Sequence, residues 1–206
     1  AELQIQAKPS MMSPAPLARR AADSASVHGD HPAAGADVAI SPDARASLSP
    51  LYEAYFEVQM ALAKDQFEAS RRGLDDLAAK TAAVDMSLFA GRAHALWMDL
   101  SRRLQTAARA GAAAGDIAAV RNAFRDLSAT AIDLHRAFGH ADDRPFYLTY
   151  CPMAFHNTGA YWLQTEGIVW NSYWGAAMLQ CGEIRDTLPA LSAGAGITAP
   201  DSGQGR

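Results

Sequence analysis

The sequence predicts an all-α fold: an antiparallel four-helix bundle with an irregular, aromatic-rich C-terminal segment packed on it. Across residues 49–138 the apolar residues recur at steps of three and four, the spacing that places them on one face of a helix. Short turns interrupt this pattern three times, so four consecutive helices are expected to pack as an antiparallel bundle. Across residues 142–188 the helical period disappears, and three of the four tryptophans occur there. Because such aromatic area is costly to leave in water, this segment is expected to lie against the bundle.

Each predicted helix has its own apolar stripe. The first helix begins at Ser49, Asp65 is suited to cap the second, and Gly139 stands where a glycine ends the fourth. After the bundle, residues 146–150 could form a short extended run and residues 175–179 a helical turn. The four stripes are Leu51, Tyr55, Val58 and Leu62; Phe67, Leu74, Leu77 and Val84; Phe89, Ala93, Leu96, Leu100, Leu104 and Ala107; and Ile117, Val120, Phe124, Leu127, Ala131, Leu134 and Phe138.

The chain is expected to consist of one domain and two tails. Residues 1–46 are rich in Ala, Pro and Ser and have no apolar period, so they are predicted to be a flexible tail. Residues 47–189 form the helical domain, and residues 190–206 a loose C-terminal tail. Some side chains in the first tail could hold a metal ion only loosely, because nothing fixes their geometry. These side chains are Met11, Met12, His28 and His31.

Charge and composition exclude several classes of function. A net charge of -4 and a sequence pI of about 5.8 give no basic face for nucleic acid. No apolar run approaches the roughly 18 residues that span a bilayer, so no membrane span is expected. The sequence has no phosphate-binding loop, and Cys151 with His156 lacks an evident oxyanion hole, so no enzymatic activity is predicted. A removed export signal would explain the start at Ala1, although a trimmed chain would look the same.

Two clusters of sulfur-containing side chains stand out in the C-terminal segment. If the chain is extended from Tyr150 to Met153, the side chains of Cys151 and Met153 point the same way. On a helical turn, Met178 and Cys181 also share a face. Thiolates and thioethers are soft donors that select copper(I) or silver(I), and zinc more weakly, over hard cations. The sequence therefore predicts a copper site that uses both clusters.

The third predicted helix offers a further donor. His94 lies beside Trp97 and four residues before Met98, just off the apolar stripe. Its imidazole is therefore a candidate ligand that would connect the bundle to the sulfur clusters.

These residues also have structural alternatives. Cys151 and Cys181 could form a disulfide, which would silence the site. Methionine more often fills a core than binds a metal, and a histidine on a helix flank more often makes a packing hydrogen bond. The roles of Met98, His135 and His156 stay open, and His135 and His140 rank lower as ligands.

Several motifs together resemble a known family. They are His94-x-x-Trp-Met98, Cys151-Pro-Met153, Gly159-Ala-Tyr-Trp-Leu163, Asn171-x-Tyr-x-Gly175 and Met178-x-x-Cys-Gly182. They resemble an uncharacterised helical domain of bacterial envelope proteins, found alone or as a C-terminal module of copper/silver efflux adaptor (membrane-fusion) proteins. The resemblance covers about residues 48–188 and implies a periplasmic, heavy-metal-associated protein. The site residues that it supports are Cys151, Met153, Met178, Cys181 and His94.

The sequence as a whole therefore predicts a periplasmic copper- or silver-binding protein. It would sequester the metal or pass it to an efflux system, with an efflux adaptor or a metallochaperone as protein partner. Two alternatives stay open. One is a copper electron-transfer protein, and the other is a metal-free interaction module that a disulfide staples and whose aromatic face docks a partner.

Overall fold

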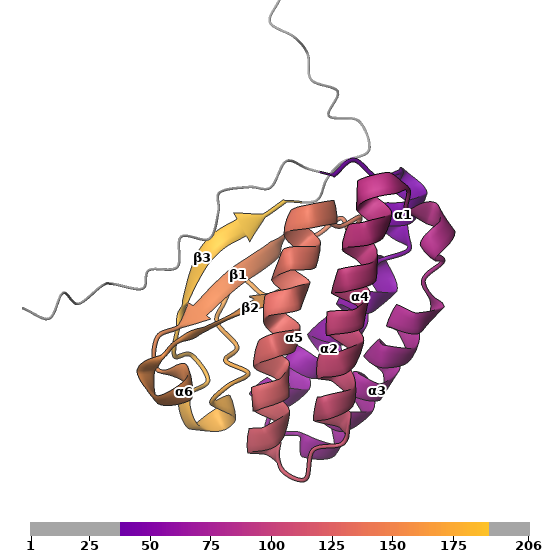
Figure 1. The fold of residues 1–206 in the computed structure, drawn as a ribbon. Helices are drawn as coiled ribbons and strands as arrows, with labels where there is room; N and C mark the ends of the chain where they lie inside the picture. Colours follow the sequence, from indigo (N-terminus) through magenta and orange to yellow (C-terminus); the bar gives the residue numbers. More distant parts are fainter. Residues whose placement is uncertain (1–37, 190–206) are drawn as a thin grey trace, which may run out of the picture. The chain divides into compact units, whose positions relative to one another are not determined.

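The apolar stripes of four long helices meet in one core, and a three-stranded sheet covers one side of it (Figure 1). The computed structural model describes residues 38–189. The elements in chain order are α1 (Pro42–Ala46), α2 (Ser49–Ala63), α3 (Phe67–Ala83), η1 (Met86–Leu88), α4 (Gly91–Ala112), α5 (Ile117–Phe138), β1 (Phe146–Cys151), α6 (Ala154–Asn157), β2 (Ala160–Gln164), η2 (Gly175–Met178) and β3 (Glu183–Leu188).

The four predicted helices are present as α2, α3, α4 and α5. Helix α2 begins at Ser49 as predicted, and α5 ends before Gly139, which has a φ of 67°. Most residues of the four stripes are buried, because each helix packs against the next one along the chain. The prediction for Asp65 is wrong: Gln66 occupies the N-cap position of α3 without a side-chain capping bond, and Asp65 itself has a φ of 55° and bonds elsewhere.

The prediction of an all-α fold is wrong, because the aromatic-rich segment contains an antiparallel sheet. The strand order is β2-β1-β3, so the central strand β1 pairs with both of the others. On one side Cys151 lies opposite Ala160, and on the other Tyr150 lies opposite Glu183. A register shift between Leu148 and Thr149 interrupts the second ladder. The chain is therefore a mixed α and β protein.

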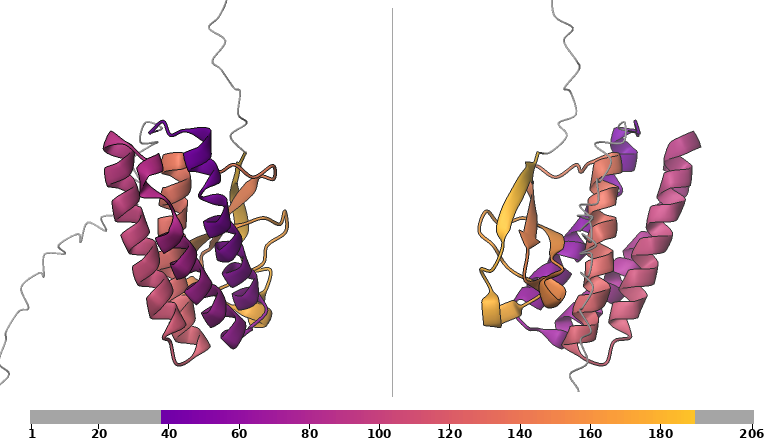
Figure 2. Two further views of the ribbon diagram at one scale, coloured as in Figure 1. Left: turned by 90° about the vertical axis from the view of Figure 1, so that its right-hand side faces the viewer. Right: turned by 60° about the vertical axis from the view of Figure 1, so that its left-hand side comes forward.

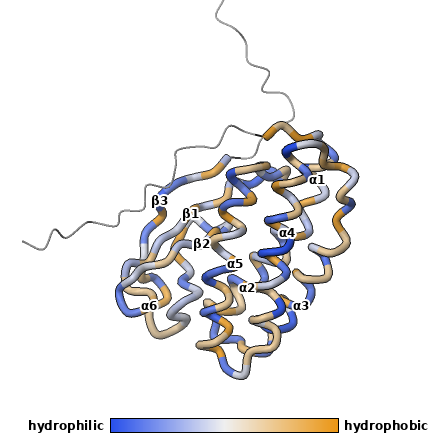
Figure 3. The backbone as a smooth tube through the Cα atoms, viewed as in Figure 1, coloured by the Kyte–Doolittle hydropathy of each residue, from blue (hydrophilic) through white to orange (hydrophobic). Residues whose placement is uncertain are grey.

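The third strand has no sequence pattern that indicates a strand. Four of the six residues of β3 are exposed, and its sequence Glu-Ile-Arg-Asp-Thr-Leu does not alternate between apolar and polar side chains. In Figure 3 this strand is mostly hydrophilic, whereas the helices change between hydrophobic and hydrophilic along their length. Charged side chains are common on edge strands, where they discourage pairing with other chains. The strand β3 therefore forms because it pairs with β1, and its own sequence does not indicate a strand.

The sheet lies against α2 and α5. Figure 2 (right) shows α5 between the sheet and α4. The ring of Phe146, the first residue of β1, contacts the rings of Tyr52 and Phe56 on α2, at centroid distances of 5.1 and 4.7 Å. Aromatic burial of this kind attaches the sheet to the bundle as one folding unit.

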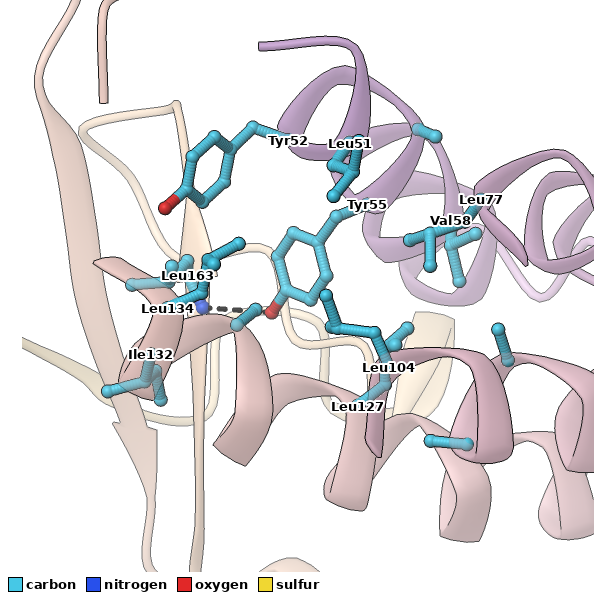
Figure 4. Packing of buried hydrophobic residues seen from close by; sticks show 14 of the residues in the cluster. Leu51, Tyr52, Tyr55, Val58, Leu77, Leu104, Leu127, Ile132, Leu134 and Leu163 are labelled. Atoms are coloured by element: carbon cyan, nitrogen blue, oxygen red, sulfur yellow. Dashed lines mark hydrogen bonds between the residues drawn. The ribbon is translucent and has the colours of Figure 1, made fainter. Parts of the chain in front are cut away.

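One buried hydroxyl joins three elements. The phenol oxygen of Tyr55 on α2 accepts a hydrogen bond from the backbone N–H of Leu163 on β2, at 3.0 Å (Figure 4). The same hydroxyl also forms a hydrogen bond with the hydroxyl of Ser128 on α5, 2.8 Å away. Leu163 and Ser128 are both fully buried, so water cannot take the place of the Tyr55 hydroxyl as their hydrogen-bond partner.

Replacing Tyr55 with phenylalanine should lower the free energy of unfolding by about 2 kcal/mol, because it leaves a buried N–H and a buried hydroxyl without a partner. Denaturant unfolding followed by circular dichroism would measure this change. The matched control is Tyr161→Phe, at an exposed side chain, which should change stability by less than about 0.5 kcal/mol. Equal effects of the two variants would contradict the bridging role.

The folded domain includes residues that were predicted to belong to the N-terminal tail. Ser41 caps α1 by accepting a hydrogen bond from the N–H of Ala44 at 3.1 Å, and Ala44 and Leu48 are fully buried. The rest of the predicted tail, with Met11, Met12, His28 and His31, lies outside the described residues, as do residues 190–206. Within residues 38–189 we find no helix with the length and apolar character needed to cross a membrane.

Candidate metal site at the paired cysteines

The first cysteine ends the central strand. Cys151 is the last residue of β1, lies opposite Ala160 on β2, and is fully buried as part of the hydrophobic core. The condition for Cys151 and Met153 to point the same way is not met, because Met153 already has helical backbone angles as the N-cap of α6 and the strand does not continue to it. Cys151 therefore points into the core, while Met153 is 42% exposed.

The second cysteine approaches the first from the loop before β3. The Sγ atoms of Cys151 and Cys181 lie 3.5 Å apart, and both thiols are free. The backbone of Cys181 is held at both ends: its N–H donates to the carbonyl oxygen of Met178 at 3.0 Å, and its carbonyl oxygen accepts from Nδ2 of Asn171 at 2.5 Å. The fold thus joins the two sulfur clusters that the sequence separates by thirty residues.

A glycine makes this approach possible. Gly182 has a φ of 136°, which side-chain-bearing residues rarely adopt. A Cβ at this position would lie 2.7 Å from the carbonyl oxygen of Tyr150 and 3.2 Å from the indole ring of Trp162. Any larger residue would push the chain away from β1 and move Cys181 away from Cys151.

The side chain of Asn171 organises the loop that carries Cys181. Its Oδ1 accepts hydrogen bonds from the backbone N–H groups of Tyr173 and Trp174, at 2.8 and 3.1 Å, while its Nδ2 bonds to Cys181. The residue is fully buried. Sequence reasoning assigned no role to Asn171, although asparagine commonly forms turns in which its side chain bonds the backbone two residues on.

A charged pair attaches the same loop to the bundle. The carboxylate of Asp65 accepts a hydrogen bond from the backbone N–H of Ala176 at 2.9 Å and one from the guanidinium of Arg121 at 2.6 Å. Arg121 also donates to the carbonyl oxygen of Ser172 at 2.9 Å. The bond from Ala176, followed by the one from Arg121, lowers the pKa of Asp65 below its usual value, so this carboxylate stays charged at neutral pH.

The neighbouring thiol influences the ionisation of Cys181. Burial, followed by the hydrogen bond with Cys151 and by repulsion from its charge, raises the pKa of the Cys181 thiol above its ordinary value. The Cys181 thiol is therefore protonated at neutral pH when no metal is bound. Because only thiolates are good ligands, a metal ion that binds both sulfurs has to displace their protons.

The two predicted thioether ligands are close in sequence to this pair. Met178 ends η2 and forms one turn with Cys181 through the bond between its carbonyl oxygen and the cysteine N–H, and it is half-buried. Met153 follows Cys151 by two residues and is exposed, so it does not fill the core. Both methionines therefore have side chains close in sequence to the thiols and outside the packed interior.

The structure does not bring His94 to the cysteines. His94 lies in the first turn of α4, which begins two residues after Phe89, and the ring of Phe89 contacts that of Phe138 at the end of α5. From that end of the bundle, β1 runs about 17 Å to Cys151, at roughly 3.3 Å per residue. Figure 2 (right) also shows that α5 separates α4 from the sheet. His94 and the exposed Met98 are therefore away from the paired thiols.

Of the other histidines near the sheet, His135 and His140 form a hydrogen-bonded pair and His156 is exposed. Nε2 of His140 lies 3.0 Å from the carbonyl oxygen of Arg144 and donates to it, so its Nδ1 accepts the bond from Nε2 of His135 at 2.9 Å. The imidazole of His140 also stacks on Phe146 at a centroid distance of 3.7 Å. Both histidines are neutral partners in a packed interface. His156 is exposed, with a φ of 57°.

This histidine pair should make the fold sensitive to acid. Burial, with repulsion from His140, lowers the pKa of His135 from 6.5 to about 4, and burial also lowers the pKa of His140. Between about pH 6.5 and pH 4 the unfolded chain binds a proton at His135 that the native chain does not. The free energy of unfolding therefore falls as the pH drops below about 6.5, and the loss ends near pH 4. We expect the free energy of unfolding to be about 1 kcal/mol lower at pH 5.5 than at pH 7.5 from His135 alone.

Urea unfolding at several pH values would measure this dependence. His135→Gln should flatten the curve, and His156→Gln, at an exposed side chain, should leave it unchanged. A wild-type curve that is flat between about pH 7.5 and 5 would contradict the neutral pair.

Comparison with known proteins identifies only the helical part of the chain. A DUF3347 domain is found at residues 51–143. The family is described as a protein of unknown function. The matched segment covers α2 to α5 and ends before β1, so both cysteines lie beyond it. No curated protein and no solved structure matches the chain.

Within the part of the chain that the structure describes, no three side chains among His, Cys, Asp and Glu are grouped so that they could hold a metal ion. The soft donors of residues 142–188 are the thiols of Cys151 and Cys181 and the thioethers of Met153 and Met178. Such a donor set is typical of copper(I) and silver(I) sites.

Proposed function

We propose that this chain binds copper(I) or silver(I) through the thiolates of Cys151 and Cys181. The observation that supports this proposal is the separation of 3.5 Å between two free thiols that come from distant segments. The loop around Asn171 and Gly182 holds them there, so the ligands are preorganised before the metal arrives.

The distance between the sulfurs favours a site with more than two ligands. If each sulfur lies about 2.3 Å from the metal, two sulfurs 3.5 Å apart subtend about 100° at the ion. A bent pair of this kind leaves room for one or two further donors. We propose Met178 as the third ligand and the exposed Met153 as a fourth or as the residue that first captures the ion.

The donor types favour copper(I) and silver(I) over zinc. Zinc sites in proteins are built from cysteine, histidine and carboxylate ligands, whereas thioethers are soft donors that select copper(I). Trp162, fully buried beside Gly182, would help to exclude water from such a site. His94 is not part of the proposed ligand set, because it lies at the other end of β1.

The proposed role is sequestration of the ion or its delivery to an efflux system in the periplasm. Support comes from the resemblance of the cysteine and methionine motifs to modules of copper/silver efflux adaptors, and from the half-exposed position of Cys181. A metal on Cys181 could be reached by an acceptor protein, while Cys151 is buried. The partner would be an efflux adaptor or a metallochaperone with its own soft ligands.

A titration of the reduced protein with copper(I), in competition with a copper(I) chelator, tests this function. We expect one tightly bound ion per chain. Because two thiol protons are displaced, the affinity should rise by up to about 100-fold per pH unit below the thiol pKa, after correction for the chelator. Binding that does not compete with the chelator, or that is independent of pH, would contradict a dithiolate site.

A further inference from the structure

The two thiols are placed for a reaction with each other as well as for a metal. Their Sγ atoms lie 3.5 Å apart and have to approach by about 1.5 Å to form a disulfide bond. Cys151 is fully buried, whereas Cys181 is half-exposed. One sulfur of the pair can therefore meet an external reagent, and the other can only meet its neighbour.

We propose that Cys151 and Cys181 form a reversible disulfide by exchange with a disulfide-bearing oxidant, and that this bond closes the metal site. This inference rests on the proposed function. The site would then load copper(I) only while the pair is reduced. In an oxidising compartment this would make copper binding depend on a reductant of the pair.

The reaction proceeds in two balanced exchange steps. The Cys181 thiolate attacks one sulfur of the oxidant, whose S–S bond breaks and whose other sulfur leaves as a thiol after taking up a proton. The Cys151 thiolate then attacks the Cys181 sulfur, and the second oxidant sulfur leaves as a thiol. The protein loses two electrons and two protons, and the oxidant gains them.

Metal and disulfide exclude each other in this arrangement. The disulfide consumes both thiolates and leaves only thioethers, which hold copper(I) far more weakly. A bound copper ion in turn occupies the thiolate electron pairs and slows the first attack. The bonds from Asn171 and to Met178 hold the Cys181 backbone in place, so the disulfide should form without unfolding of the loop.

Oxidised glutathione is a suitable probe for the full-length, reduced protein. We expect an intrachain disulfide, detected as a mass lower by two hydrogen atoms and as the loss of both titratable thiols. The melting temperature should rise by roughly 10 °C, because the bond closes a loop of about thirty residues. The copper(I) affinity should fall on the order of 100-fold or more and recover after reduction.

The matched control is Cys181→Ser, which cannot form an intrachain disulfide and whose melting temperature glutathione should not raise. A wild-type protein that binds copper(I) but forms only a mixed disulfide would overturn this inference and leave the proposed function standing. An oxidised protein with undiminished copper affinity would overturn the exclusion of copper by the disulfide. A reduced protein that binds no copper(I) would overturn the proposed function and the redox control with it, whatever the mass spectrum shows.

Discussion

Exchanging Cys181 for serine should lower the affinity for copper(I) by on the order of 100- to 1,000-fold. Structural zinc sites gain roughly 10–16 kcal/mol from four ligands, or roughly 2.5–4 kcal/mol for each, and a thiolate is the strongest donor in the proposed set. Serine keeps the size of the side chain but has no thiolate. A competition titration with a copper(I) chelator on the two proteins side by side would measure the difference.

Three variants control this result. Cys151→Ser should lose a similar amount of affinity, and Cys151→Ala does so without leaving a buried hydroxyl in an apolar position. His94→Ala should bind copper(I) as wild type does, because α5 lies between α4 and the sheet. Full retention of tight binding by both cysteine variants would contradict the site, and a large loss in His94→Ala would contradict its proposed ligand set.

Replacing Asn171 with alanine should have the largest effect on the fold around the site. The change removes a fully buried side chain and leaves the carbonyl oxygen of Cys181 and the N–H groups of Tyr173 and Trp174 without their partner. Each unsatisfied group costs about 1–3 kcal/mol, so we expect the free energy of unfolding to fall by about 3 kcal/mol. Copper(I) affinity should also fall, by roughly 10- to 100-fold, because Cys181 is no longer held beside Cys151.

Asn122→Ala is the matched control. Asn122 is exposed on α5, so its loss should change stability by less than about 0.5 kcal/mol and copper affinity not at all. Urea unfolding and the same chelator titration would provide both values. If Asn171→Ala were as stable as Asn122→Ala, the loop before β3 would not depend on this side chain.

The helices could be predicted from the sequence because their cause is local. The stripe from Leu51 to Leu62 has the helical period over three turns, and α2 forms where that period begins and ends. The same holds for the stripe that ends at Phe138, where Gly139 adopts a positive φ.

The sheet could be predicted only in part, because its strands depend on partners far away in the sequence. The run from Phe146 to Tyr150 has strand composition and became β1. By contrast, β3 is polar on most of its surface and exists because β1 offers a free edge. The expectation of an irregular segment followed from the absence of a helical period, which does not distinguish a sheet from a loop.

The soft donors could be found from the sequence, but their spatial grouping could not. Cys151 and Cys181 were predicted to act together, and the fold brings their sulfurs to 3.5 Å. His94 was joined to them by residue type alone. The length of β1 and the position of α5 separate His94 from the thiols, and neither feature is visible in a local motif.

X-ray absorption spectroscopy at the copper edge, on the reduced protein loaded with one equivalent of copper(I), tests the central claim most directly. We predict a first shell of sulfur atoms only, two from Cys151 and Cys181 and one or two from methionine, and the loss of this shell in the Cys151→Ala/Cys181→Ser double variant. A first shell of nitrogen or oxygen atoms, or a spectrum that the double variant leaves unchanged, would contradict the paired-cysteine site.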